Sequence, residues 1–306
     1  MGLLSKIKYR RKLYNYFKKI EDFLDNGYYS VDDKLIKKID PSDESFFKRF
    51  KVNSKEEKLF KYKSGSLFFT KYKSGFLTND KAFYFLNNKN RYDVYKSNYL
   101  SYRARLLYPS FNLEFVDDRL LVIGPIVEGT IYKDLSHFDA FLDSLFEYAD
   151  KNDFDFKIFN YDDKNINLPW YVQHGDCKNA NIVWSGNKFT LIDLEAIDLY
   201  PPLYDVFYYL FITKKEDSIK VLESQKFQNS VKHFFKMSIK DVPDNILDIS
   251  LACYANYTVS QLKKGMDLYE SEFYLFWRKY DSFKKYPLTK RMLDEYQRKI
   301  IEYGLK

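Results

Sequence analysis

The chain has 306 residues, enough for one large or two modest domains with a substantial core. Hydrophobic residues make up 45% and aromatic residues 20%, which argues against disorder, and no apolar run approaches the roughly 18 residues of a transmembrane helix. The formal net charge is +7, but no stacking module or recognition motif accompanies it. We therefore expect no specific nucleic-acid partner.

The first 40 residues are predicted to form a basic amphipathic helical segment. Apolar residues recur at mostly helical spacings between Leu3 and Leu24, and seven Lys and Arg lie between positions 6 and 19. We expect the apolar stripe to pack on the rest of the protein, with weak contact to an anionic membrane as the alternative. The segment lacks the apolar core of a signal peptide, and two cysteines make no disulfide framework. The expected location is the cytoplasm, peripheral at the inner membrane face if the helix binds lipid.

Residues 41–127 are predicted to form a small antiparallel sheet with one helix. Alternating apolar and polar residues indicate strands at 45–52, 58–63 and 66–73, with turns at 53–56 and 64–65. Periodic tyrosines then predict a helix over 91–108. A strand pair at 113–116 and 120–123 leads to a connector at 125–129. The sequence therefore predicts a separate, strand-rich unit.

Residues 128–306 are predicted to be mostly helical, with one hairpin among the helices. An amphipathic pattern predicts a helix over 135–150. Short strands at 182–184 and 189–192 flank a turn with Gly and Asn. Beyond residue 203, after two prolines, the pattern is helical. The hairpin thus lies within the larger unit.

Three oxygen-bearing side chains surround this hairpin. Asp176 lies in the segment His174–Gly175–Asp176, Asn181 follows five residues later, and Asp193 follows twelve beyond that. Because a hairpin returns the chain to its starting point, we expect the three groups to converge. Such oxygens are ligands of Mg²⁺ beside nucleotide phosphates. The alternative is an ordinary hairpin whose Asp and Asn serve only the turns.

The pattern His-Gly-Asp, four residues, Asn and then Ile-Asp-x-Glu resembles the aminoglycoside phosphotransferase and choline kinase branch of the protein-kinase-like fold. The resemblance covers about residues 44–215 and implies a bilobal α+β fold, with a small antiparallel β-sheet lobe at 41–127 and a larger, mostly helical lobe at 128–306. It also implies ATP, or GTP, and Mg²⁺ as cofactors. The long polar insert before the helix at 91–108 is similar to that of bacterial lipopolysaccharide-core (heptose) kinases.

The resemblance, carried over by position, implies roles for the residues of the loop. Asp176 would be the catalytic base, and His174 would brace the loop. Lys178 would neutralise charge near the transferred phosphate, or it is a plain surface lysine. Asp205 matches a buried Asp that braces the same loop.

The resemblance also implies a metal site at the hairpin. Asn181 and Asp193 would bind Mg²⁺, and Glu195 would add a further ligand or orient metal-bound water. Asp198 extends this acidic group, although solvation or helix capping explains both later carboxylates equally well.

A kinase-like small lobe needs a cation on its third strand to bind the nucleotide phosphates. Lys71 is favoured, and Lys96 in a Val-x-x-Lys pattern is the alternative. If the predicted strand register is wrong by two residues, Lys73 takes the place of Lys71. Glu128 in the connector is a further candidate nucleotide-binding residue. Two departures from the family pattern are a helix with Asp93 as its only carboxylate and a first turn without glycine.

The sequence therefore predicts an ATP-dependent phosphotransferase that acts on a hydroxyl of a small molecule or saccharide. A surface-glycan or lipopolysaccharide-type sugar is the first acceptor that the resemblance suggests. A choline- or aminoglycoside-type kinase and a catalytically dead kinase-like binding module are the alternatives. The oligomeric state is left open.

Overall fold

The computed structural model describes residues 23, 27–31, 35–39, 63–69, 73–77, 81–105, 112–131, 138–149, 154–186, 189–213, 216–263 and 285–304. The chain divides into two compact units, one of residues 1–96 and 111–126 and the other of 97–110 and 127–306. The predicted N-terminal amphipathic helix and its membrane contact, and the strand at 45–52, lie outside the described residues. Within these residues no helix is long and apolar enough to cross a membrane.

Thirteen strands are described in the part of the chain that the structure covers. They are β1 (Gly27–Val31), β2 (Leu35–Ile39), β3 (Lys63–Phe69), β4 (Lys73–Leu77), β5 (Lys81–Leu86), β6 (Glu114–Val116), β7 (Leu121–Pro125), β8 (Thr130–Ile131), β9 (Asp155–Tyr161), β10 (Lys164–Gln173), β11 (Ile182–Trp184), β12 (Phe189–Leu191) and β13 (Asp198–Tyr200). The described α-helices are α2 (Lys89–Tyr102), α3 (Phe138–Ala149), α4 (Tyr204–Thr213), α5 (Glu216–Glu223), α6 (Gln225–Ser238), α7 (Ile246–Lys263) and α10 (Pro287–Glu302).

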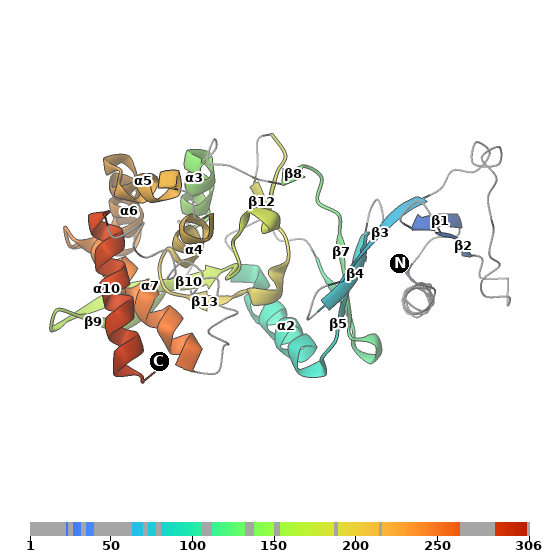
Figure 1. Cartoon of the computed structure of the whole chain (residues 1–306), viewed down its shortest axis with the longest axis horizontal. Coiled ribbons are helices and arrows are strands. Elements are labelled where there is room, and N and C mark those ends of the chain that lie inside the picture. Colours follow the sequence, from blue (N-terminus) through green and yellow to red (C-terminus); the bar gives the residue numbers. More distant parts are fainter. Residues whose placement is uncertain are drawn as a thin grey trace. The chain divides into compact units, whose positions relative to one another are not determined.

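The smaller unit is built on a seven-stranded sheet in the order β2-β1-β3-β4-β5-β7-β6. Neighbouring strands are antiparallel except for the parallel pair β1 and β3. Figure 1 shows β3, β4, β5 and β7 side by side. On β5, Phe83 lies opposite Phe76 of β4 and Ile123 of β7. Both Phe83 and Ile123 are buried, so the sheet has a hydrophobic core.

Tyrosines form the buried face of helix α2. It begins after Asn88, whose side-chain oxygen accepts the backbone N–H of Asn90 at 2.8 Å. Tyr92 and Tyr95 lie on one helix face, are buried, and meet the Phe115 ring edge-on at 5.9 and 5.5 Å. The helix predicted at 91–108 is thus confirmed, although its last turn is a 3₁₀ helix that is described to Arg105.

Three predictions for the smaller unit are corrected by the structure. The turn predicted at 64–65 lies inside β3, where Gly65 pairs with Val31 of β1. The strand predicted at 66–73 ends at Phe69, and a new strand begins at Lys73. The N-terminal helical segment does not extend to residue 40, because β1 and β2 occupy 27–31 and 35–39.

The larger unit contains two small sheets, in the orders β13-β10-β9 and β12-β11-β8. The hairpin of β11 and β12 was predicted, whereas the longer hairpin of β9 and β10 was not. Strand β10 pairs with β9 in its first part and with β13 near its end, where Gln173 lies opposite Asp198. Strand β10 of the first sheet therefore precedes the segment that contains Asp176, and β11 of the second sheet follows it.

Helices α3, α5 and α7 contact α4. On this helix Phe207, Tyr209 and Leu210 are fully buried. Phe138 at the start of α3 stacks on Tyr209 with ring centroids 5.9 Å apart. Helices α7 and α10 run side by side (Figure 1). The helical pattern beyond residue 203 is thus confirmed for the described residues.

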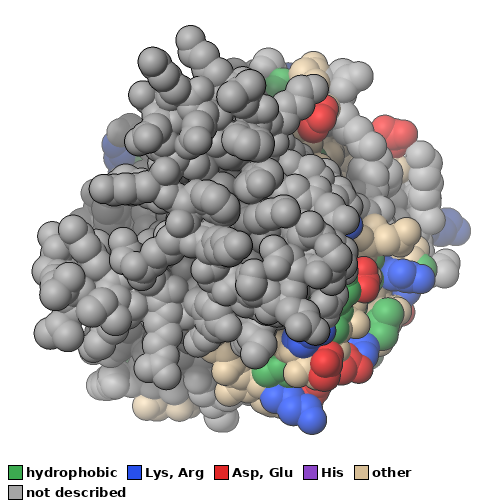
Figure 2. Space-filling view, turned by 90° about the vertical axis from the view of Figure 1, so that its right-hand side faces the viewer, with side chains coloured by type: hydrophobic (Ala, Val, Ile, Leu, Met, Phe, Trp, Pro, Cys, Tyr) green, Lys and Arg blue, Asp and Glu red, His purple; other side chains and the backbone are tan. Residues whose placement is uncertain are grey.

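The described surface carries charges of both signs. In Figure 2, the described part of the face shows Lys and Arg side chains next to Asp and Glu side chains. Such mixing is usual for a solvated surface. With a mainly antiparallel sheet unit and a mostly helical unit, the predicted α+β fold is confirmed.

Candidate active site

A tight loop connects β10 to β11 and carries the predicted catalytic residues. The Lys178 N–H bonds to the Asp176 carbonyl at 3.0 Å, and the Asn181 N–H bonds to the Lys178 carbonyl at 2.8 Å. A 3₁₀ turn at Asn179–Asn181 then leads into β11. The loop therefore holds its own shape through backbone hydrogen bonds.

Asp205, at the start of α4, accepts two hydrogen bonds from the backbone of the loop. Its Oδ2 accepts the N–H of His174 at 2.7 Å, and its Oδ1 accepts the N–H of Gly175 at 2.9 Å. The side chain is buried. Burial raises the pKa of Asp205, while the nearby His174 ring and the two N–H donors act in the opposite direction. One carboxylate thus satisfies two N–H groups of the loop.

His174 connects the loop to the end of the hairpin. Its Nδ1 accepts the N–H of Asp176 at 3.2 Å, so the ring proton lies on Nε2, which donates to the Ile192 carbonyl at 2.7 Å. The Ile192 N–H in turn bonds to the Asn181 carbonyl at 2.9 Å. The His174 side chain therefore joins the two segments that carry Asp176 and Asp193.

Three donors hold the Asp176 carboxylate. Oδ2 accepts from Asn181 Nδ2 and from Lys178 Nζ, both at 2.9 Å. Oδ1 accepts from the Tyr208 hydroxyl at 2.8 Å. The side chain is 26% exposed, so solvent reaches it. Sequence reasoning missed Tyr208, although its position one helical turn after Asp205 was a signal.

Asn181 and Asp193 offer a donor set that suits Mg²⁺. Asn181 Nδ2 donates to the carbonyl and the carboxylate of Asp176, both at 2.9 Å, so its Oδ1 lies on the opposite side of the amide. Asp193 directly follows Ile192, which pairs with Asn181, and has a left-handed backbone with φ 66°. Among the residues described, no three His, Cys, Asp or Glu side chains gather as a metal site. Mg²⁺ needs only one or two protein carboxylates when a nucleotide supplies further oxygens.

Stacked tyrosine rings lie next to the loop. The rings of Tyr200 and Tyr204 stack with centroids 4.4 Å apart, and Tyr204 stacks on Tyr208 at 5.9 Å. Cys177 is buried, and burial raises the pKa of its thiol. Burial therefore favours the protonated thiol over the nucleophilic thiolate.

The remaining predicted site residues are not brought into this hydrogen-bonded group by the contacts described. Glu195 lies in a 3₁₀ turn at Leu194–Ala196, and Glu128 is exposed between β7 and β8. Lys96 is on α2, where its Nζ bonds to both oxygens of Asp117 at 2.6 and 2.7 Å. Lys71 lies outside the described residues.

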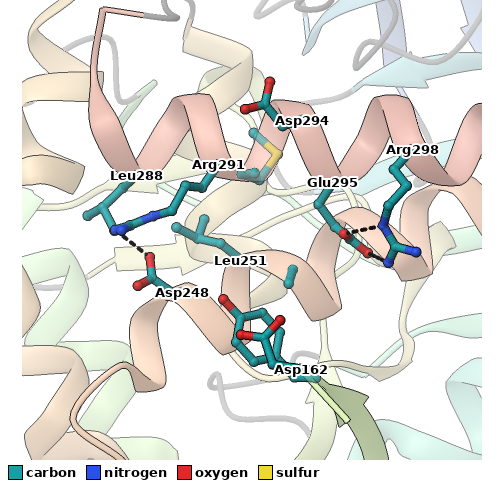
Figure 3. A pocket seen from close by; sticks show the side chains of 11 residues that line it. Asp162, Asp248, Leu251, Leu288, Arg291, Asp294, Glu295 and Arg298 are labelled. Atoms are coloured by element: carbon teal, nitrogen blue, oxygen red, sulfur yellow. Dashed lines mark hydrogen bonds and ion pairs between the residues drawn. The ribbon is translucent and has the colours of Figure 1, made fainter.

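A separate cavity of about 280 Å³ lies between α7, α10 and the turn of the β9–β10 hairpin (Figure 3). Two pairs of its charged side chains form ion pairs, Arg291 with Asp248 at 2.8 Å and Arg298 with Glu295 at 2.7 Å. The turn is at the opposite end of β10 from Gln173. Nine residues of strand separate these ends by roughly 30 Å, so this cavity is distinct from the loop site.

Comparison with known proteins bears on the same stretch of the chain. Residues 132–233, which contain the loop, the hairpin and α4, match the model of the phosphotransferase enzyme family. The match covers about a third of the chain, and this third carries the candidate site. Among curated proteins, none matches the sequence.

Similar solved structures include three kinases. A choline/ethanolamine kinase family protein from Mesorhizobium loti is 12% identical, with a TM-score of 0.42 over 75% of this chain and 92% of that chain. Aminoglycoside phosphotransferase APH(2'')-Ib, with ADP bound, is 10% identical, with a TM-score of 0.44 over 80% and 99%. Choline kinase from Streptococcus pneumoniae is 12% identical, with a TM-score of 0.39 over 82% and 97%. At this level of similarity none of the three identifies an acceptor.

Proposed function

We propose that the chain transfers the γ-phosphoryl group of ATP to a hydroxyl group of a small molecule or saccharide. The observation that carries the proposal is the Asp176 carboxylate, held by Asn181, Lys178 and Tyr208 in a stretch that matches the phosphotransferase enzyme family. A solvent-accessible carboxylate fixed in this way is suited to accept a proton from a bound hydroxyl.

Asp176 acts as the general base in this proposal. The acceptor oxygen bonds to the γ-phosphorus, the bond from that phosphorus to the β–γ bridging oxygen breaks, and the hydroxyl proton passes to Asp176. Lys178, whose Nζ is 2.9 Å from Asp176 Oδ2, places a positive charge beside the transferred group. His174 and Asp205 keep the loop in place through their hydrogen bonds.

Asn181 and Asp193 would hold Mg²⁺, with Glu195 as a further ligand or as a group that orients water. When bound, the ion neutralises charge on the β- and γ-phosphates. Lys71, Lys96 and Glu128 remain the predicted nucleotide-binding residues. The ion pair of Lys96 with Asp117 favours Lys71, because phosphate binding by Lys96 would have to replace that pair.

The acceptor that we propose is a sugar of a surface glycan, with lipopolysaccharide-type sugars first. The proposal rests on the sequence resemblance of the stretch before α2 to lipopolysaccharide-core kinases. In the structure much of that stretch forms strands β4 and β5 rather than a polar insert. A sugar offers the hydroxyl group that the proposed chemistry needs. Because choline and aminoglycosides also carry hydroxyl groups, they are the competitors that a test must include.

The experiment is a transfer assay with γ-labelled ATP, Mg²⁺ and a panel of sugars, amino alcohols and aminoglycosides. A thermal-shift screen selects the panel, since ligands that bind only the native state raise its stability. We expect Mg²⁺-dependent labelling of a sugar. Labelling of choline or an aminoglycoside instead would reject the sugar. If label reached neither an acceptor nor water, the chain would be a binding module rather than a kinase.

A further inference from the structure

We propose that Tyr208 is a positioning residue that aims the Asp176 carboxylate at the acceptor. The inference rests on the proposed function and adds a residue to its site. It starts from one contact, the 2.8 Å hydrogen bond from the Tyr208 hydroxyl to Asp176 Oδ1. None of the sequence motifs contains this residue.

The two oxygens of Asp176 have different partners. Asn181 Nδ2 and Lys178 Nζ both bind Oδ2 at 2.9 Å. Tyr208 binds Oδ1 from a separate element, helix α4. A carboxylate oxygen accepts about two hydrogen bonds, so Oδ1 keeps one position for an incoming hydroxyl group. Oδ1 is therefore the oxygen that takes the proton.

Helix α4 holds Tyr208 firmly enough for this task. Asp205 and Tyr208 are three residues apart, which places them on the same face of the helix. Asp205 binds the backbone of the loop while Tyr208 binds its carboxylate, so one helix fixes both. The Tyr208 ring also stacks on Tyr204, with centroids 5.9 Å apart and planes 20° apart.

Loss of the Tyr208 hydroxyl would leave Oδ1 without this fixed donor. The carboxylate could then turn about its Cβ–Cγ bond while Oδ2 alone is held. A small misplacement of a reacting group can slow a reaction up to about 100-fold. The effect should fall on the transfer step and not on nucleotide affinity, because the hydroxyl contacts the base.

Tyr208→Phe tests the proposal, with Tyr204→Phe as the matched control. Both variants remove one hydroxyl from neighbouring rings of the same stack, but only the Tyr208 hydroxyl bonds to Asp176. The readout is Mg²⁺-dependent release of γ-phosphate from ATP, with water as the acceptor, in the full chain. We expect Tyr208→Phe to lower kcat about 10- to 100-fold with KM for ATP unchanged. Tyr204→Phe should stay within about twofold.

Further measurements separate positioning from structure. In an Asp176→Asn background, Tyr208→Phe should lower kcat no further, since the two groups act as one unit. Equal activity of Tyr208→Phe and the wild type would overturn the proposal, as would a rise of KM together with the fall in kcat. A wild-type chain that releases no γ-phosphate and labels no acceptor rejects the proposed function itself, and this inference with it.

Discussion

Gly175 lies between His174 and Asp176 and has a backbone that other residues rarely adopt, with φ +80°. A Cβ atom here would lie 2.2 Å from the Tyr200 hydroxyl and 2.4 Å from the Ala196 carbonyl oxygen. That hydroxyl donates to the same carbonyl at 2.6 Å. The close approach of Tyr200 to the loop therefore requires glycine at this position.

Gly175→Ala should lower the free energy of unfolding by about 2–4 kcal/mol, from backbone strain together with the collision. Gly186→Ala is the matched control, because Gly186 has φ +93° and no atom within 4 Å of an added Cβ. The control should lose only about 1 kcal/mol, from strain alone. Urea unfolding measures the free energy of unfolding of both variants. Equal losses would show that the Tyr200 side chain moves away from the added Cβ atom without an energetic cost.

Asp193→Ala should abolish the strengthening of ATP binding by Mg²⁺, because it removes the carboxylate proposed to bind the ion. Calorimetric titration with ATP, with Mg²⁺ or with EDTA, measures the difference directly. Glu195 lies two residues later and is a candidate substitute ligand, so the double variant should be titrated too. An unchanged Mg²⁺ effect in both variants would reject the metal assignment.

At the scale of elements, α4 connects the helical core to the loop. Its buried side chains, such as Phe207 and Leu210, fix the helix in the larger unit. Asp205 and Tyr208 then extend from its first two turns to the loop. The core of the larger unit therefore determines where Asp176 lies.

Asp205→Asn should destabilise the fold by about 2–4 kcal/mol, because one of the two loop N–H groups would face an amide N–H instead of an oxygen. Asp217→Asn on α5 is the same substitution at a side chain that is 75% exposed and pairs with Lys220. The loss there should be at most about 1 kcal/mol. A similar small loss at Asp205 would mean that it does not hold the loop.

The elements that sequence analysis found and missed differ in their turns. The hairpin of β11 and β12 has Gly186 in its turn, a standard signal. The hairpin of β9 and β10 turns at Asp162 and Asp163, both with positive φ, without the usual Gly or Asn. Its strand β9 is also mostly exposed, so it shows no clear alternation of buried and exposed residues. The local sequence signal for this hairpin was therefore weaker than that for the hairpin of β11 and β12.

For the whole molecule, residues close in sequence were easier to predict than residues brought together by folding. The loop contacts among His174, Asp176 and Asn181 follow from one short segment and its hairpin. Tyr208 reaches Asp176 because α4 packs against that segment, and its position one helical turn after Asp205 was the only sequence signal for this contact. Gly65 was predicted in a turn because glycine favours turns, but pairing with β1 places it in a strand.

We propose Asp176 as the base of an ATP-dependent phosphotransferase. The most direct test compares the wild type with Asp176→Asn, a change of almost the same shape that removes the base. The measurement is the rate of Mg²⁺-dependent γ-phosphate loss from ATP, together with calorimetric affinity for Mg²⁺–ATP. We expect a rate about 10²–10⁴-fold lower in the variant, with the affinity unchanged. Turnover near that of the wild type would contradict it.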